Sequence, residues 1–205
     1  MHKAGAIILI LFMFISVNLA AQQGGDEPDI ETDWDVYHTD LYVRGDQLFV
    51  ISLGTVFPTI FINNGSFIDP KFTPPVGGTG SLAYNYYLGP RLFIGGEISG
   101  QFIHTLGGNT LFIIPLGLRV GTQFIAGRFE FPLYLSVGMN WHRYGNFTYY
   151  GLYAKAAAAA YFRATSEWSF GLSSSWSWYP QWTKDKQYNV DGNFADIMLT
   201  ARYHF

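Results

Sequence analysis

The chain has 205 residues, of which 19% are aromatic and 13% are charged, an unusual balance for a water-soluble globular protein. It contains no cysteine, which excludes a disulfide framework, thiolate metal sites and lipid attachment to an N-terminal cysteine. Its formal net charge of −3 gives no reason to expect nucleic-acid binding.

The start of the chain has the three parts of a secretory signal peptide. Lys3 supplies a positive charge, residues 4–15 are apolar, and residues 16–21 are small residues that end in Leu-Ala-Ala. The apolar run is too short for a transmembrane helix. We therefore expect residues 1–21 to be removed, which leaves a mature chain of one-domain size.

Residues 22–46 differ from the rest of the chain because they are rich in carboxylates. Such a segment buries little apolar area, so we expect it to be flexible. The folded domain is then predicted to cover residues 47–205. The carboxylates of the acidic segment are Asp26, Glu27, Asp29, Glu31, Asp33, Asp35, Asp40 and Asp46.

Eight later segments alternate between apolar and polar residues, which is the pattern of β-strands with two different faces. In residues 128–142, for example, every second residue from Phe129 to Trp141 is apolar. The alanine run 156–160 suits a helix as well, but the surrounding tyrosines and the short connections favour a strand. The predicted strands are 47–62, 76–88, 91–104, 110–125, 128–142, 149–163, 167–179 and 193–205.

Charged side chains avoid the apolar face of every predicted strand. A soluble sheet turns its charged face to water, whereas a transmembrane barrel turns its apolar face to lipid, where a charge costs about 2–4 kcal/mol. The polar faces carry charged residues in pairs on one strand: Arg91 with Glu97, Arg128 with Glu130, Lys155 with Arg163, and Asp196 with Arg202.

The connections also alternate in length. Those after the second, fourth and sixth strands are very short, and those after the first and seventh, 63–75 and 180–192, are long and polar. Outer-membrane barrels have short periplasmic turns and longer outer loops. We therefore predict an all-β fold, an eight-stranded antiparallel transmembrane up-and-down β-barrel in the bacterial outer membrane, with residues 22–46 in the periplasm. A soluble secreted sandwich explains the uninterrupted apolar faces less well.

With these segments and its terminal Arg-Tyr-His-Phe, the chain resembles the small outer-membrane β-barrels of the OmpW, OmpX and OmpA-domain type. Four stretches resemble more closely a spirochaete, Treponema-type family of such barrels: Gly-Gly-Glu-Ile-Ser-Gly (95–100), Gly-Arg-Phe-Glu-Phe-Pro-Leu (127–133), Trp-Ser-Phe-Gly-Leu (168–172) and Ala-Arg-Tyr-His-Phe (201–205). The resemblance spans residues 47–205.

This resemblance implies a location in outer-membrane lipid and insertion by the barrel-assembly machinery, with Tyr203 and Phe205 as the insertion signal. It implies no reaction. OmpW relatives are associated with the passage of small hydrophobic molecules, and OmpX-like and OmpA-like barrels with adhesion or envelope integrity.

An eight-stranded barrel has an interior just wide enough for side chains or one small ligand. Strand pairing brings Glu97 close to Arg119, and Glu130 is expected between Arg128 and Arg163. Buried charges must pair whatever the function, so they form either a closed plug or a gate in a narrow path. The candidates for this plug or gate are Glu97, Arg119, Gln123, Arg128, Glu130, Tyr134, Lys155, Arg163, Asp196 and Arg202.

We expect no enzyme activity, no cofactor and no metal. Some small barrels use a serine, a histidine and a carboxylate at the outer rim, but no serine is expected within reach of His104 or His142. Two histidines without a third ligand are weak evidence for a metal site. Four tryptophans are expected at the membrane interface: Trp141, Trp168, Trp176 and Trp178.

Two functions therefore stay open for a monomeric, porin-like barrel. The first is passive passage of small hydrophobic molecules, with sideways exit where the alanines of residues 149–163 or Gly80, Gly96 and Gly100 weaken the wall. The second is a closed structural or surface-interaction barrel with a plugged lumen, whose contact surface is formed by the loops 63–75 and 180–192.

Overall fold

The computed structural model describes residues 42–63, 65–68, 72–105, 109–182 and 189–205. The predicted signal peptide, 1–21, and residues 22–41 of the acidic segment lie outside these ranges. Among the described residues, no helix has the length and apolar character needed to cross a membrane. The strands are β1 (Gln47–Asn63), β2 (Ser66–Ile68), β3 (Phe72–Tyr87), β4 (Leu92–Thr105), β5 (Thr110–Ala126), β6 (Phe129–Tyr144), β7 (Phe147–Arg163), β8 (Trp168–Pro180) and β9 (Val190–His204).

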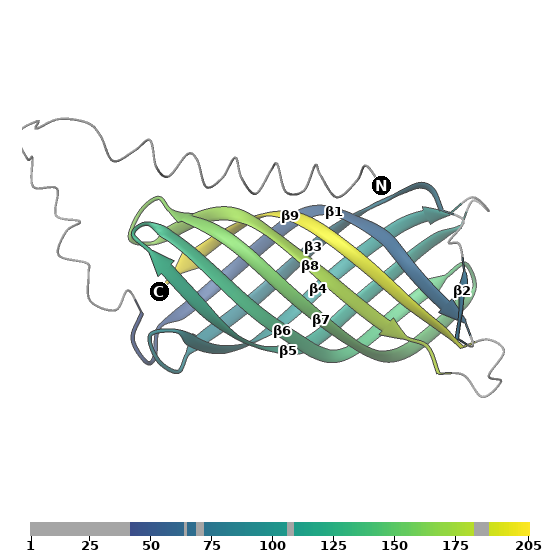
Figure 1. The fold of residues 1–205 in the computed structure, drawn as a ribbon, viewed down its shortest axis with the longest axis horizontal. Helices are drawn as coiled ribbons and strands as arrows, with labels where there is room; N and C mark the ends of the chain where they lie inside the picture. Colours follow the sequence, from purple (N-terminus) through teal and green to yellow (C-terminus); the bar gives the residue numbers. More distant parts are fainter. Residues whose placement is uncertain (1–41, 64, 69–71, 106–108, 183–188) are drawn as a thin grey trace, which may run out of the picture. The chain divides into compact units, whose positions relative to one another are not determined.

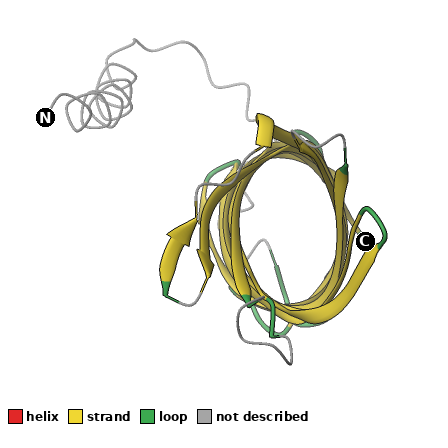
Figure 2. Cartoon of the chain, turned by 90° about the vertical axis from the view of Figure 1, so that its right-hand side faces the viewer, coloured by secondary structure: helices red, strands yellow, loops and turns green. Residues whose placement is uncertain are grey.

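Eight long strands close into a barrel. From β3 to β9 each strand pairs antiparallel with the next, and β1 pairs with both β3 and β9. The β1–β9 pairing begins at Leu48 opposite His204 and closes the ring seen in Figure 2. The predicted eight-stranded antiparallel up-and-down barrel is thus confirmed.

The two faces of each strand meet different surroundings, as the alternation predicts. Leu118 is 74% exposed and Leu199 is 71% exposed on the outer face. Glu97 and Arg202, from the opposite face, are 3% and 1% exposed. The apolar residues thus form the outer wall, and the charged residues fill the lumen, which is the arrangement of a barrel in lipid.

Two-residue turns connect β5 to β6 and β6 to β7. Gly127 and Gly145, each with φ of 58°, take the first position of these turns, where a positive φ matches the twist of the flanking strands. One end of the barrel carries the Gly127 turn, the start of β1 and the end of β9. We call it the turn end. The opposite end, with β2, is the loop end (Figure 1).

Two features of β1 were not predicted. The short strand β2 pairs with the last residues of β1 to form a hairpin at the loop end. The β1–β9 register shifts by one residue between Pro58 and Phe61, so that Thr59 and Ile60 together lie opposite Asn193. This bulge exchanges the faces of β1, and Phe61 therefore packs against lumen side chains although it continues the outward register of Ile51 and Leu53.

Candidate functional site

The lumen holds nine of the ten residues predicted to form a plug or gate. Eight of them are buried: Glu97, Arg119, Gln123, Glu130, Tyr134, Lys155, Asp196 and Arg202. The ninth, Arg163, is half-buried, and its side chain is 16% exposed.

Three of these residues form what we call the central layer: Glu97, Arg119 and Lys155. Arg119 Nη1 lies 3.4 Å from Glu97 Oε2, and Lys155 Nζ contacts Glu97 Oε1. The guanidinium of Arg119 also lies over the Tyr134 ring, 3.9 Å from its centroid. One carboxylate therefore holds two buried cations, and an aromatic face supports one of them.

Asp196 lies beside this layer. Ser175 Oγ donates a hydrogen bond of 2.5 Å to Asp196 Oδ2, and Asp196 and Lys155 interact electrostatically. With Asp196 included, two carboxylates face two cations, so the charges in this part of the lumen are balanced.

A second group of charges, the turn-end cluster, consists of Glu130, Arg163 and Arg202. Glu130 is fully buried, with Arg202 Nη1 3.1 Å from one carboxylate oxygen and Arg163 Nη1 3.7 Å from the other. The guanidinium of Arg202 also lies 3.5 Å from the centroid of the Tyr161 ring.

The sequence analysis was wrong to place Arg128 in the lumen beside Glu130. Arg128 is exposed in the two-residue turn before β6. It lies beyond the last paired residues, Ala126 and Phe129, so the alternation of the strand does not fix its direction. Arg202 from β9 takes the place beside Glu130 that was expected for Arg128.

Tyr42, from the segment expected to be flexible, is only 1% exposed. Its hydroxyl donates to Glu130 Oε2 at 2.7 Å and lies 3.3 Å from His204 Nδ1. Burial, followed by the nearby Glu130 carboxylate, raises the pKa of the Tyr42 phenol well above its usual value, which keeps it a neutral donor. The ordered part of the barrel domain thus begins at least five residues before the predicted boundary at Gln47.

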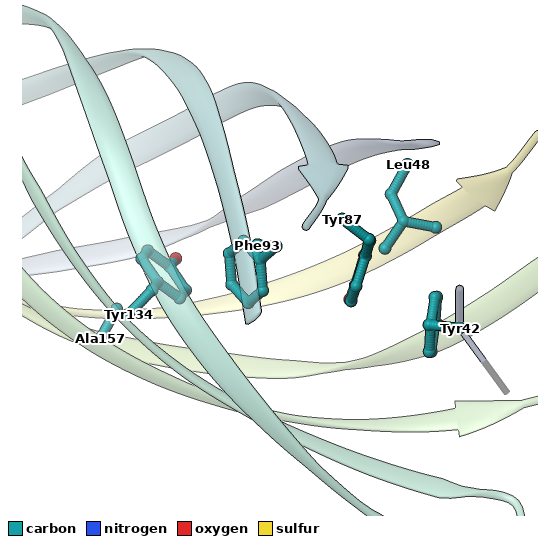
Figure 3. Close-up of a cluster of buried hydrophobic side chains, with 6 residues drawn as sticks. All are labelled: Tyr42, Leu48, Tyr87, Phe93, Tyr134 and Ala157. Atoms are coloured by element: carbon teal, nitrogen blue, oxygen red, sulfur yellow. The ribbon is translucent and has the colours of Figure 1, made fainter. Parts of the chain in front are cut away.

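Tyr42 begins a column of buried side chains along the lumen (Figure 3). Its ring stacks on Tyr87, with centroids 4.3 Å apart and planes 12° apart, and Tyr87 contacts Phe93 at 5.6 Å. Arg119 lies 5.7 Å from the centroid of Phe93. The column therefore connects Tyr42 at the turn end with the central layer.

Possible catalytic and metal-binding groups are limited. Ser169 Oγ lies 2.8 Å from His204 Nε2, a pair that the sequence analysis did not identify, and Ser169 is fully buried. His104 contacts Thr110, and His142 contacts Asn140. Within the described ranges, no group of three His, Cys, Asp or Glu side chains could hold a metal.

At the loop end the lumen opens into a largely apolar cavity of about 460 Å³, which we call the outer cup. Its polar groups are few, mainly His142, Tyr149 and Gln181 near the rim. Buried apolar side chains that face the lumen, among them Ile113, Tyr179 and Phe194, form its wall. The cup is lined by Phe61, Leu111, Ile113, His142, Tyr144, Phe147, Tyr149, Tyr179, Gln181, Val190, Gly192 and Phe194.

The sequence analysis missed the outer cup although a signal for it exists. On several strands the lumen-facing register becomes apolar toward the loop end, as at Ile103 after Gln101 and at Phe194 before Asp196. A polar lumen with an apolar mouth could therefore have been predicted. The place of Phe61 in the cup could not have been predicted, because Phe61 turns into the lumen only through the bulge in β1.

The predicted interface aromatics lie on the outer wall. Trp168, Trp176 and Trp178 are 38%, 44% and 40% exposed, and Trp141 is half-buried. Tyr203 packs between Trp168 and Phe205, at centroid distances of 5.0 Å from each. Phe205 itself is 69% exposed.

The fold defines the structural class of the protein, a closed eight-stranded antiparallel β-barrel. The crystal structure of Neisserial surface protein A is similar, with a TM-score of 0.59 and 7% sequence identity over 78% of this chain and 97% of that chain. At this identity the similarity concerns the fold alone.

The sequence comparisons identify the family. A protein-family model matches residues 26–203. Two uncharacterized proteins of Treponema pallidum (strain Nichols) are similar: one is 30% identical over 63% of this chain and 59% of its own length, the other 31% identical over 58% of this chain and 42% of its own length. The chain thus spans less than two thirds of either relative. It belongs to the family that the model describes.

Proposed function

We propose that this protein resides in the outer membrane and takes up one small apolar molecule at a time at its loop end, without catalysis. The turn end then faces the periplasm, as short turns do in such barrels. The observation that carries the proposal is the outer cup, whose volume of about 460 Å³ suits a single small ligand.

The lining of the cup indicates the chemistry of its ligand. Aromatic and aliphatic side chains bury apolar surface, which provides most of the binding free energy. His142 and Tyr149, with ring centroids 4.9 Å apart, offer polar groups at the rim. We therefore expect a compact apolar molecule with at most one or two hydrogen-bonding groups.

The interior below the cup favours sideways exit over a water-filled path. The central layer fills the lumen with paired side chains that are nearly inaccessible to solvent. An apolar molecule would have to displace these charges to continue along the axis, at a large desolvation cost. The membrane around the barrel is the more favourable destination.

The exit we propose lies at the β1–β9 bulge beside the cup. Between Pro58 and Phe61 the ladder is interrupted, and side chains bridge the two strands instead. Thr59 Oγ1 donates to the Asn193 carbonyl at 2.9 Å, and Asn193 Nδ2 donates to the Ile60 carbonyl at 3.1 Å. Phe61 and Gly192, which line the cup, border this interruption.

This position differs from the one expected from the sequence. Gly80 and Gly100 are direct partners in an unbroken β3–β4 ladder from Gly77 to Tyr87. Pairs are missing at Gly100 in the β4–β5 ladder and at Ala159 and Ala160 in the β6–β7 ladder, but neither ladder shifts its register there. The extra residue in β1 does shift the register.

Insertion and assembly belong to the same proposal. The outward apolar face of β9, which includes Tyr203, and the following Phe205 form the surface that we expect the barrel-assembly machinery to bind. Because β1 and β9 close the ring and the apolar outer face suits lipid, a monomer is sufficient.

Binding of a small apolar fluorophore, N-phenyl-1-naphthylamine, to the refolded protein tests the cup directly. Phe194→Ala is expected to weaken binding at least tenfold, because it removes a buried wall of the cup. Phe112→Ala, the same change on the outer face near the loop end, is the matched control and should leave binding unchanged. Equal effects of the two variants would contradict a ligand site in the cup.

A planar-bilayer measurement tests the closed lumen independently. We expect no reproducible single-channel conductance from the refolded protein. Regular channels that change when Glu97 or Arg119 is replaced would mean that the central layer is a gate in an aqueous path, and the sideways route would then be wrong.

A second candidate function, a closed surface-interaction barrel, is favoured by the β1–β2 hairpin. Phe67 in β2 is 80% exposed at the loop end, and exposed aromatic residues are common in protein interfaces. Binding to immobilised extracellular matrix that is lost when residues 65–68 are replaced by glycine and serine, yet retained in Phe194→Ala, would support this function over uptake.

A further inference from the structure

The turn end of the lumen contains a feature that the proposed uptake does not use. Tyr42 precedes β1 and belongs to no strand, yet its side chain is inserted into the lumen (Figure 3). We propose that Tyr42 is a removable stopper, which closes the turn end of the lumen when inserted and opens the lumen to water when withdrawn.

The contacts of Tyr42 account for closure. Its ring covers Tyr87, and its hydroxyl covers the Glu130 carboxylate, and both of these residues are 0% exposed. The Arg163 guanidinium lies 5.6 Å from the centroid of the Tyr42 ring. The inserted side chain thus covers the start of the aromatic column and the Glu130 carboxylate, while Arg163 stays partly exposed.

The backbone around Tyr42 allows withdrawal without opening the barrel. The next residues form a turn in which Asp46 Oδ2 accepts from the Val43 amide at 2.9 Å. Gly45 N–H donates to the Tyr87 carbonyl, and Tyr87 N–H donates to the Asp46 carbonyl. These bonds anchor the chain after Tyr42, and within the described residues Tyr42 itself is held through its side chain.

The groups that Tyr42 leaves behind keep partners of their own. Glu130 retains its ion pairs with Arg202 and Arg163, and His204 retains its contact with Ser169. Withdrawal therefore breaks no strand pairing and leaves no buried carboxylate without a cation. This distinguishes Tyr42 from the lumen side chains of the strands, which cannot leave without unfolding.

Withdrawal would open a vestibule at the turn end, with Tyr87 as its floor. The Arg163 and Arg202 guanidiniums and the Glu130 carboxylate would line it, together with His204 and Ser169. Its cations outnumber its carboxylates, so it would admit small anions.

The family match begins at residue 26 and therefore includes the segment that carries Tyr42.

The chain has no cysteine, so one introduced thiol reports on this vestibule alone. Ser169→Cys places the thiol beside His204, at a position that is 0% exposed. We would measure its reaction with a small anionic methanethiosulfonate on the refolded full-length protein. The rate is expected to rise at least tenfold when Tyr42→Ala is added.

Tyr86→Ala is the matched control, because Tyr86 directly precedes Tyr87 in β3 but is half-buried, and the alternation of the strand turns it away from the lumen. Equal rates in the Tyr42→Ala and Tyr86→Ala backgrounds would overturn the proposal, and so would fast reaction with Tyr42 present. Heat-modifiable migration in gel electrophoresis verifies folding.

If Tyr42→Ala does not fold, Asp46→Ala serves as a second variant, because it loosens the turn and leaves the Tyr42 ring intact. A faster reaction of the thiol then supports the stopper, and an unchanged rate rejects it. The thiol and the reagent do not enter the outer cup, so the outcome is independent of ligand uptake.

Discussion

The guanidinium carbon of Arg119 lies 3.9 Å from the centroid of the Tyr134 ring, while Nη1 of the same group lies 3.4 Å from Glu97 Oε2. Arg119 is therefore held by a ring face and by a carboxylate together. Lys155 approaches the other oxygen of that carboxylate. The central layer thus depends on Glu97 more than on either cation, because removing Glu97 leaves Asp196 to balance two buried positive charges.

Glu97→Gln is therefore expected to destabilise the barrel by about 3–5 kcal/mol, the usual cost of breaking a buried ion pair on one side. Urea unfolding of the protein in lipid vesicles measures this change. Glu167→Gln, the same substitution at an exposed turn residue, should change stability by less than about 0.5 kcal/mol.

A double variant shows whether the loss of stability comes from the broken Glu97–Lys155 pair or from general damage to the lumen. Adding Lys155→Met to Glu97→Gln removes the excess cation, so that Asp196 and Arg119 balance in charge, and should recover a substantial part of the lost stability. A double variant whose stability equals the sum of the two single effects would show that Lys155 and Glu97 are not coupled.

The turn-end cluster predicts different effects for its two arginines. Arg202→Met removes a cation that is 1% exposed and lies 3.1 Å from Glu130, and is expected to cost about 3–5 kcal/mol. Arg163→Met removes a partly exposed side chain at 3.7 Å, so its cost should be smaller and should decrease in high salt. Equal, salt-independent costs in urea unfolding would contradict this order.

Much of the fold could be predicted because lipid imposes the same rule on every strand. Apolar residues such as Leu118 and Leu199 must alternate with lumen residues such as Arg119 and Asp196, and this period of two defines each strand without knowledge of its neighbours. The partnership of Glu97 and Arg119 followed from pairing adjacent strands, and the structure places them in contact.

The features that were missed break this alternation or lie outside it. The bulge after Pro58 adds one residue and turns Phe61 into the lumen, and a local pattern cannot reveal a register shift relative to β9. Arg128 occupies a turn, where side-chain direction follows the turn geometry. Tyr42 lies in a segment rich in carboxylates, and only the completed barrel creates its binding site between Tyr87 and Glu130.

Two glycine variants test how closely adjacent strands and lumen residues are packed. A Cβ on Gly138 would lie 2.2 Å from the Leu116 carbonyl oxygen and 2.4 Å from the Gly117 Cα, both backbone atoms that cannot move aside. Gly138→Ala is therefore expected to reduce the yield of heat-modifiable, folded barrel severely. At Gly96 a Cβ meets nothing within 4 Å, so Gly96→Ala should fold normally and gain up to about 1 kcal/mol. Normal folding of Gly138→Ala would contradict the close β5–β6 approach.

Asn193 joins the bulge to both neighbouring strands, which makes it a specific test of sideways exit. Its Nδ2 donates to the Ile60 carbonyl at 3.1 Å, and its Oδ1 accepts from Trp176 Nε1 at 3.1 Å. Asn193→Ala removes both bonds, and we expect a stability loss of about 1–2 kcal/mol. If exit occurs here, the dissociation rate of N-phenyl-1-naphthylamine from the protein in vesicles should rise several-fold, without any ion conductance. Ser175→Ala, which removes a lumen hydrogen bond to Asp196 away from the bulge, is the control for general loosening. The same acceleration in both variants would place the exit elsewhere.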